Sequence, residues 1–441
     1  MRMVPTINET GSRLFVGTDH GKVFCVDTAV SPPQRVVWQW QMSGTVYPVR
    51  SGIAYDPTAP KAGGGTEPAV YFQANDGQTY SLNATTGAVR WQQDTGNLYG
   101  PPPAADHPDP WSSTPVIDLY GNVFVGSANG FVYCLNPSTG AVVWRVRLNA
   151  TGLSNGAEPV EATPAIGENG WLYVATRTSA QVGSVSHLYA IDPSREAANP
   201  QDAQEKIVWS SFHLDWNEPG VIAGLVVDQC GTVMVPIFHS LLYRFDGTSG
   251  EMKGDALFTN GKLCQAPALN RNGLLILGTS KDSAGLGERS IRGFQISPEP
   301  NASGDWVTTT WGNGAGVFGD FLGGVLLRAN SRGWAYLADA NLATGAGAVY
   351  RLNSGSPSMP GDWPTLGCGN RRHHTARTYP YTLIELGPFY EGSPNAQGAF
   401  SVDALGRVVG YAHGNPVYPE NYLPIEWYGA WWQNHGWPNL L

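Results

Sequence analysis

The sequence predicts an all-β chain built from repeated four-stranded antiparallel units. The stretch Asp109–Leu148 contains four short apolar runs joined by turns that carry glycine or asparagine, a pattern typical of a strand meander. Trp38, Trp91 and Trp144 recur at a constant interval of 53 residues (38 to 91 and 91 to 144). No window carries a sustained apolar stripe at helical spacing. Because a single small sheet leaves two faces uncovered, the repeats must pack against one another.

The clearest unit has four predicted strands: Thr114–Leu119, Val123–Ser127, Phe131–Leu135 and Val142–Leu148. Seven such units follow one another: Val4–Trp40, Gly52–Asp94, Asp109–Leu148, Ala162–Leu214, Ala223–Phe258, Ala266–Trp311 and Gly324–Trp363. In each of them, β-rich runs alternate with turn residues.

Insertions and substitutions distinguish the units. The second unit contains a Gly/Pro insertion at Pro57–Pro68, and the fourth contains polar insertions at Thr178–Ser186 and Arg195–Glu205. Trp209 keeps the place of the other tryptophans in the fourth unit, whereas Lys253 replaces it in the fifth. Glycine and proline fall at regular turn positions, so the chain is not a disordered low-complexity sequence.

Composition limits the classes of partner. The chain has 441 residues, of which 42% are hydrophobic and only 14% are charged, against about 25% charged residues in an average domain. The net charge is −9, and without a run of Lys or Arg this argues against nucleic acid and anionic membranes as partners. No apolar run approaches the roughly 18 residues of a membrane span. The opening residues carry no signal-peptide core, although the few lysines and many tryptophans and glycines favour an exported protein.

Two segments carry a specific resemblance. LNATTGAVRW (Leu82–Trp91) and LNPSTGAVVW (Leu135–Trp144) share the pattern Leu/Ile-Asp/Asn-x-x-x-Gly-x-x-x-Trp. This pattern resembles the PQQ-type β-propeller repeat, which occurs in quinoprotein dehydrogenases and in periplasmic propellers similar to the outer-membrane assembly lipoprotein BamB. The resemblance extends over residues 4–375 and implies a propeller whose blades pack side by side.

The residues of the repeat have physical roles in such a propeller. Gly87 and Gly140 can adopt the positive φ that the turn into the outer strand requires. A tryptophan fills the wide gap between adjacent blades, where a large rigid side chain buries much area. We therefore expect structural blade-packing roles for the four tryptophans at this position, Trp38, Trp91, Trp144 and Trp209.

The last stretch, Tyr381–Leu441, differs from the other units. Ala399-Phe400, Val408-Val409-Gly410 and Ala430-Trp431-Trp432 resemble the HAF repeat of probable extracellular proteins, which also reads as a strand meander. The sequence thus predicts about eight four-stranded blades. Residues 1–375 form the first seven, and residues 376–441 form the last blade of the same propeller. The alternative is a seven-bladed ring with an appended β module.

Few residues stand out as a chemical site. A quinoprotein dehydrogenase of this family needs a Ca²⁺ site, an aromatic floor and often adjacent cysteines, but the chain has neither adjacent cysteines nor a haem-attachment motif. The sequence therefore predicts no cofactor, PQQ with calcium included. Asp106, His107 and Asp109 are weak metal-ligand candidates on a Pro-rich loop. We interpret them as solvated loop residues. No catalytic residue is predicted.

Two groups could form a partner surface: the cluster Arg371, Arg372, His373 and His374, and the late aromatics Trp427 and Trp432. The sequence favours a non-catalytic binding or scaffold propeller of the bacterial cell envelope or surface. Its partners would be other proteins or a surface polymer, and it would be located in the periplasm or outside the cell. One alternative is a PQQ-dependent quinoprotein-like oxidoreductase, and another is a carbohydrate-binding surface protein. The oligomeric state stays open.

Overall fold

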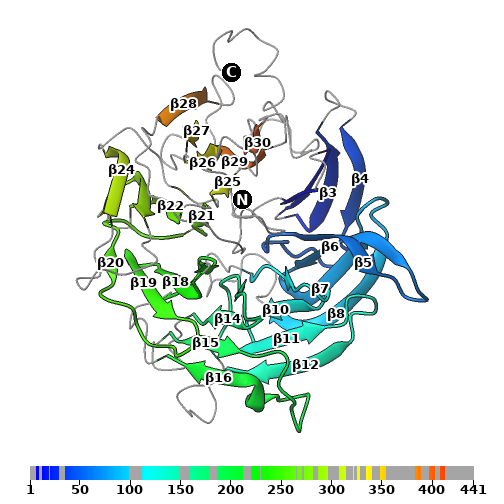
Figure 1. Cartoon of the computed structure of the whole chain (residues 1–441). Helices are drawn as coiled ribbons and strands as arrows, with labels where there is room; N and C mark the ends of the chain where they lie inside the picture. Colours follow the sequence, from blue (N-terminus) through cyan, green and yellow to red (C-terminus); the bar gives the residue numbers. More distant parts are fainter. Residues whose placement is uncertain are drawn as a thin grey trace.

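A computed structural model of the chain shows a ring of β-sheets (Figure 1). The structure describes residues 6–8, 12–18, 20–28, 35–98, 112–148, 158–177, 186–211, 220–228, 230–264, 266–270, 273–281, 287–295, 307–313, 321, 325–327, 334–339, 348–353, 383–388, 397–402 and 408–412. Within these residues, the helical part is one short 3₁₀ turn, η2 (Gln204–Lys206). This confirms the predicted all-β fold.

Seven sheets have four strands, and an eighth has two described strands. The first three sheets are β1–β4 (Thr6–Ile7, Arg13–Gly17, Lys22–Asp27, Val36–Gln41), β5–β8 (Ala54–Pro60, Thr66–Gln73, Asp76–Asn83, Val89–Leu98) and β9–β12 (Val116–Ile117, Val123–Gly126, Phe131–Leu135, Val142–Arg147). The next two are β13–β16 (Ala165–Ile166, Leu172–Ala175, Leu188–Ile191, Ile207–Ser210) and β17–β20 (Val226–Val227, Thr232–Ile237, Leu241–Asp246, Leu257–Phe258). The last three are β21–β24 (Ala268–Leu269, Leu274–Thr279, Ser290–Gln295, Val307–Asn313), β25–β28 (Leu326–Leu327, Trp334–Ala338, Ala348–Asn353, Leu383–Pro388) and β29–β30 (Gln397–Val402, Val408–Ala412).

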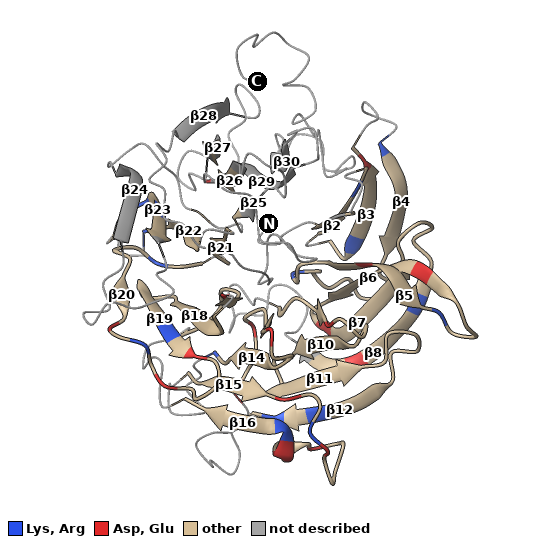
Figure 2. Ribbon diagram, in the orientation of Figure 1, with Lys and Arg blue, Asp and Glu red and all other residues tan. Residues whose placement is uncertain are grey.

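The sheets are antiparallel meanders arranged as the blades of a propeller. In each four-stranded sheet, consecutive strands pair in chain order. The first strands of neighbouring sheets lie together, as β1 does with β5, and β5 with β9. The first strands are therefore central and the fourth strands lie at the rim. Over the described part of the ring, Lys and Arg are interspersed with Asp and Glu along the ribbon, without a concentration of one sign (Figure 2).

Local signals placed the strands of the third sheet well. The predicted run Phe131–Leu135 coincides with β11. The predicted run Val123–Ser127 extends one residue beyond the end of β10. The turn glycines Gly121 and Gly130 have φ of 84° and 80°, a conformation that glycine adopts without a steric penalty.

The Gly/Pro insertion Pro57–Pro68 forms the hairpin that joins β5 to β6. Strand β5 runs to Pro60 and β6 begins at Thr66. Pro57 and Pro60 are tolerated because β5 is the first strand of its sheet and has one unpaired edge. The register shifts between Asp56 and Ala59, so Pro68 lies opposite a bulge, where the ladder of hydrogen bonds is already interrupted.

The last described strands, β29 and β30, form a sheet between the seventh sheet and the first. The segment Leu383–Pro388 pairs as β28 with β27 and is the fourth strand of the seventh sheet. Strand β29 lies beside β25, β26 and β27, and also beside β1. The segments Tyr428–Gln433 and Trp437–Leu440, which would complete the expected last blade, fall outside the described residues, as does the proposed boundary at residue 375. The described strands therefore bring the last sheet next to the first.

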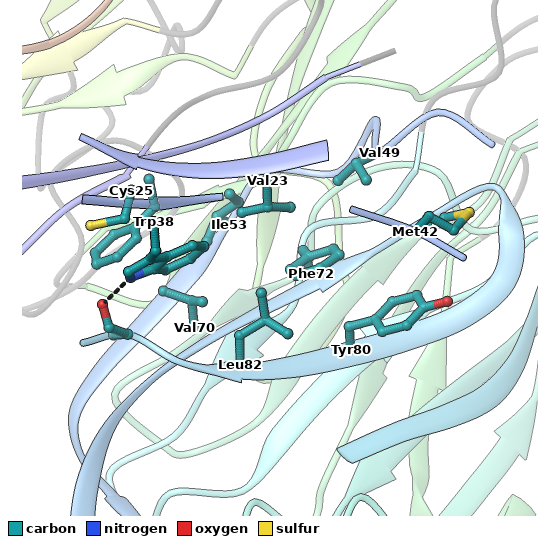
Figure 3. Packing of buried hydrophobic residues seen from close by; sticks show 13 residues of the cluster. Val23, Cys25, Trp38, Met42, Val49, Ile53, Val70, Phe72, Tyr80 and Leu82 are labelled. Carbon is teal, nitrogen blue, oxygen red and sulfur yellow. Dashed lines mark hydrogen bonds between the residues drawn. The ribbon is translucent and has the colours of Figure 1, made fainter. Parts of the chain in front are cut away.

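The apolar core is divided among the contacts between neighbouring sheets. Between the first two sheets, Val23, Cys25 and Trp38 face Val70 and Leu82 (Figure 3), and all five side chains are at most 8% exposed. At about 25 cal/mol per Å² of buried apolar area, such interfaces supply most of the driving force that joins one blade to the next.

Candidate functional site

A tryptophan–glycine contact joins successive sheets. Trp91 of β8 is 6% exposed, and its indole N–H donates a hydrogen bond to the carbonyl of Pro137 (2.9 Å) in the third sheet. A Cβ added to Gly140 would lie 2.6 Å from Trp91 Cδ2 and Cε3. Only a glycine therefore lets the turn of the third sheet close over the tryptophan of the second.

The same contact recurs around the ring. Trp38 donates to the carbonyl of Ala84 (2.9 Å) and lies against Gly87. Trp209 donates to the carbonyl of Gly247 (3.1 Å) and lies against Gly250.

The tryptophan of the third sheet is covered in a different way. Trp144 is 6% exposed, and Lys206 Nζ lies 5.1 Å from the centroid of its ring, within the range of a cation–π contact. Lys206 also donates to the carbonyl of Pro193 (2.8 Å). All four tryptophans of the repeat thus lie where one sheet meets the next.

Arg90 ties the hairpin β5–β6 to the third sheet. Its guanidinium donates to Glu67 Oε1 (2.9 Å), to the carbonyl of Pro137 (3.3 Å) and to the carbonyl of Pro60. The hydrogen bond from Arg90 is the main reason why the pKa of the Glu67 carboxyl is lowered. Sequence reasoning missed Arg90 because it occupies an unspecified position of the repeat pattern.

A buried polar network lies in the fourth sheet, next to the third. Glu158 Oε2 accepts hydrogen bonds from His187 Nδ1 (2.9 Å), Thr176 Oγ1 (2.9 Å) and the hydroxyl of Tyr189 (3.0 Å). Glu158 is 0% exposed and His187 is 3% exposed. A carboxylate that accepts three hydrogen bonds is well stabilised despite its burial. Because substrate cannot reach this pair, we interpret it as holding the ends of its strands in place.

An ion pair between Arg177 and Glu161 lies close to this network along the chain. Arg177 Nη1 is 3.0 Å from Glu161 Oε1, and Glu161 is 2% exposed. Both glutamates precede β13, and Arg177 follows β14. Such buried pairs stabilise a structure only when their hydrogen-bonding groups are satisfied.

A weak sequence signal did point toward the network. The repeat places a tyrosine two residues before its Leu/Ile-Asn/Asp pair. The hydroxyl of Tyr80 donates to Asp76 Oδ2 (2.5 Å), Asn129 Nδ2 donates to the hydroxyl of Tyr133 (2.8 Å), and Tyr189 binds Glu158. The recurring tyrosine predicts a polar partner, but not which residue supplies it.

The remaining candidates from the sequence are not brought together by the described part of the chain. The weak metal candidates and both possible partner surfaces lie outside it: Asp106, His107, Asp109, Arg371, Arg372, His373, His374, Trp427 and Trp432. Among the described residues, no group of three or more His, Cys, Asp or Glu could hold a metal ion. In that same part, no helix is long and apolar enough to cross a membrane.

Two cysteines are part of the apolar core. Cys25 and Cys134 are buried in equivalent strands, β3 and β11, and burial raises the pKa of each thiol to about 12. At neutral pH both remain thiols, which pack as small apolar side chains.

Comparison with known proteins supports the propeller. The sequence family described as outer membrane protein assembly factor BamB matches residues 7–186. The crystal structure of BamB from Moraxella catarrhalis is similar to this chain, with a TM-score of 0.51 and 17% sequence identity, and the similarity covers 77% of this chain and 82% of that chain. At this identity the likeness shows the fold alone. Comparison with curated protein sequences gives no significant match.

Proposed function

We propose that the chain is a non-catalytic binding propeller of the bacterial cell envelope that holds other proteins in contact. The observation that carries the proposal is the match of residues 7–186 to the family described as outer membrane protein assembly factor BamB. The shared ring architecture is consistent with it. The placement in the periplasm or at the cell surface rests on the same match.

The physical character of the ring favours a binding role. The Trp–Gly contacts and the Arg90 hydrogen bonds lock neighbouring blades together. A rigid scaffold that presents short turns on its two faces binds partners at a low cost in conformational entropy. The charges are few and mixed, which suits a protein partner better than a polyanion.

The proposed binding role requires no cofactor, and two assays distinguish it from the alternative functions. Titration with PQQ and Ca²⁺, followed by absorbance and dye reduction, distinguishes it from a quinoprotein-like oxidoreductase. A glycan array distinguishes it from a carbohydrate-binding protein. We further propose that residues 376–441, whose strand β28 pairs in the seventh sheet, also supply the last blade of the same propeller, as supported by the position of β29 beside β1.

Cross-linking in native cells tests the binding role. The tagged chain is cross-linked, the envelope fraction is isolated, and the adducts are identified by mass spectrometry. We expect a defined protein adduct in the envelope fraction, which then binds the chain when both are purified. Recovery of the chain away from the envelope, or quinone-dependent dye reduction, would overturn the proposal.

A further inference from the structure

We infer that the turn Leu119-Tyr120 is an anchor by which the propeller docks into an apolar pocket of a protein partner. The inference rests on the proposed function and assigns a surface to it. The turn joins β9 to β10 in the third sheet. Leu119 is 94% exposed and Tyr120 is 89% exposed, the highest values among the large apolar side chains of the described residues.

The turn does not need these two residues for its shape. Asp118 Oδ1 accepts the N–H groups of Tyr120 (2.9 Å) and Asn122 (2.8 Å), and Asn122 Nδ2 donates to Asp118 Oδ2 (2.8 Å). Gly121 supplies the positive φ of 84°. The turn is therefore fixed by Asp118, Gly121 and Asn122, and the side chains of Leu119 and Tyr120 point away from it.

The residues at the positions of Leu119 and Tyr120 differ in the other sheets. In the fourth sheet the corresponding residues are Glu168-Asn169, followed by Gly170 with φ of 78°. The sixth sheet has Arg271-Asn272, and the fifth has Gln229-Cys230. A Leu-Tyr pair is thus peculiar to the third sheet among these four. Large apolar side chains exposed where polar ones fit equally well mark a contact surface.

The base of the turn is rigid. A Cβ added to Gly121 would lie 3.8 Å from Pro60 Cδ and 4.0 Å from Pro137 Cγ, so the turn stands beside the hairpin β5–β6 and the turn β11–β12. Arg90 donates to the carbonyls of both prolines. An anchor held in this way loses little freedom on binding, and tyrosine is among the residues most enriched at energetic hot spots.

Interface area and net charge indicate which kind of molecule binds the turn. One buried aromatic side chain contributes about 150–250 Å², whereas a stable dimer needs about 1,200–2,000 Å² in total. The two side chains alone are too small for any stable interface, and a second copy of the chain carries the same net charge of −9, which opposes self-association. The net charge of −9 opposes attachment to an anionic bilayer. The binding partner that fits is a different protein with an apolar pocket. Leu119 and Tyr120 would enter this pocket at the centre of a wider interface.

Site-specific photo-cross-linking tests the location. A photo-cross-linking phenylalanine analogue replaces Tyr120 in the full chain, and Asn169 in a control, and both proteins are activated in native cells. The inference predicts an adduct with one identified protein at position 120 and its absence at position 169. A position-120 adduct with a second copy or with lipid, the same adduct at both positions, or no adduct at all would each overturn it.

An affinity measurement tests the energetics with the identified partner in purified form. The variant Leu119→Glu/Tyr120→Asn gives the third sheet the turn residues of the fourth, so its melting temperature should match that of the unchanged chain. We expect the variant to bind more than about tenfold more weakly, and the control Glu168→Ala to bind normally. Equal binding by both variants refutes the anchor but leaves the proposed function intact. Failure of the unchanged chain to bind any purified partner counts against the proposed function and the anchor together.

Discussion

Replacing Gly140 by alanine should destabilise the ring more than the same change at a turn glycine without a tryptophan neighbour. Gly140 has φ of 74°, and its added Cβ would lie 2.6 Å from two carbons of Trp91. The positive φ alone costs an L-residue about 1–2 kcal/mol. The steric overlap adds about 1–3 kcal/mol, as overpacking in a dense core does. The sum is a loss of about 2–5 kcal/mol.

Gly170→Ala is the matched control. Gly170 has φ of 78°, and its added Cβ would meet no atom within 4 Å, so only the backbone cost of about 1–2 kcal/mol applies. Urea unfolding followed by tryptophan fluorescence measures both variants, with comparison at equal m-values. In a Trp91→Ala background, the extra cost at Gly140 should vanish. Equal losses for the two glycine variants, or an extra cost that persists without Trp91, would refute the Trp–Gly contact.

Three further predictions concern a buried tryptophan, two buried cysteines and a partly exposed ion pair. Trp144→Ala should cost about 3–5 kcal/mol in unfolding free energy, and a variant that melts like the unchanged chain would place this tryptophan at the surface. Cys25 and Cys134, with pKa values near 12, should resist maleimide at pH 7 and react after denaturation; native labelling detected by mass spectrometry would contradict their burial. Arg90 lowers the pKa of the Glu67 carboxyl from its ordinary value of 4.5. The stabilisation that the Glu67–Arg90 pair gives the folded chain is therefore complete above pH 4.5 and is lost as the pH falls through the lowered pKa. Glu67→Gln should therefore be less stable at pH 7 and show a shallower loss of stability in acid, whereas an unchanged acid profile would rule this pair out.

The sequence predicted what depends on local signals. The strand Phe131–Leu135 and the turns at Gly121 and Gly130 follow from short runs and turn residues. In the second and third units, the repeat pattern also predicted a turn glycine and, four residues later, a tryptophan that packs between blades. It did not show that Gly140 holds Trp91 of the preceding sheet, because that pairing crosses between blades.

The contacts that sequence reasoning missed join residues far apart in the chain. The insertion Arg195–Glu205 covers the outer strand of the third sheet: the N–H of Arg145 donates to the carbonyl of Pro200 (2.9 Å), and the N–H of Ala203 donates to that of Arg145 (2.8 Å). The hydrogen bond between Glu158 and His187 likewise joins residues that are far apart in the chain. Polar insertions of this kind carry no periodicity that would predict a partner.

The closed ring underlies both the fold and the proposed function, and a truncation tests it directly. A chain ending near Tyr379 would remove β28 as well as the last sheet, so a chain ending at Tyr390 is the cleaner choice because it keeps β28 and removes β29 and β30. Since β29 lies against the seventh sheet and β1, its loss uncovers a face of each of these sheets, and exposed apolar faces favour association. Sedimentation and thermal unfolding should show an aggregating chain with a lower melting temperature. A monomer with an unchanged melting temperature would contradict closure by the last sheet and favour a seven-bladed ring with an appended module.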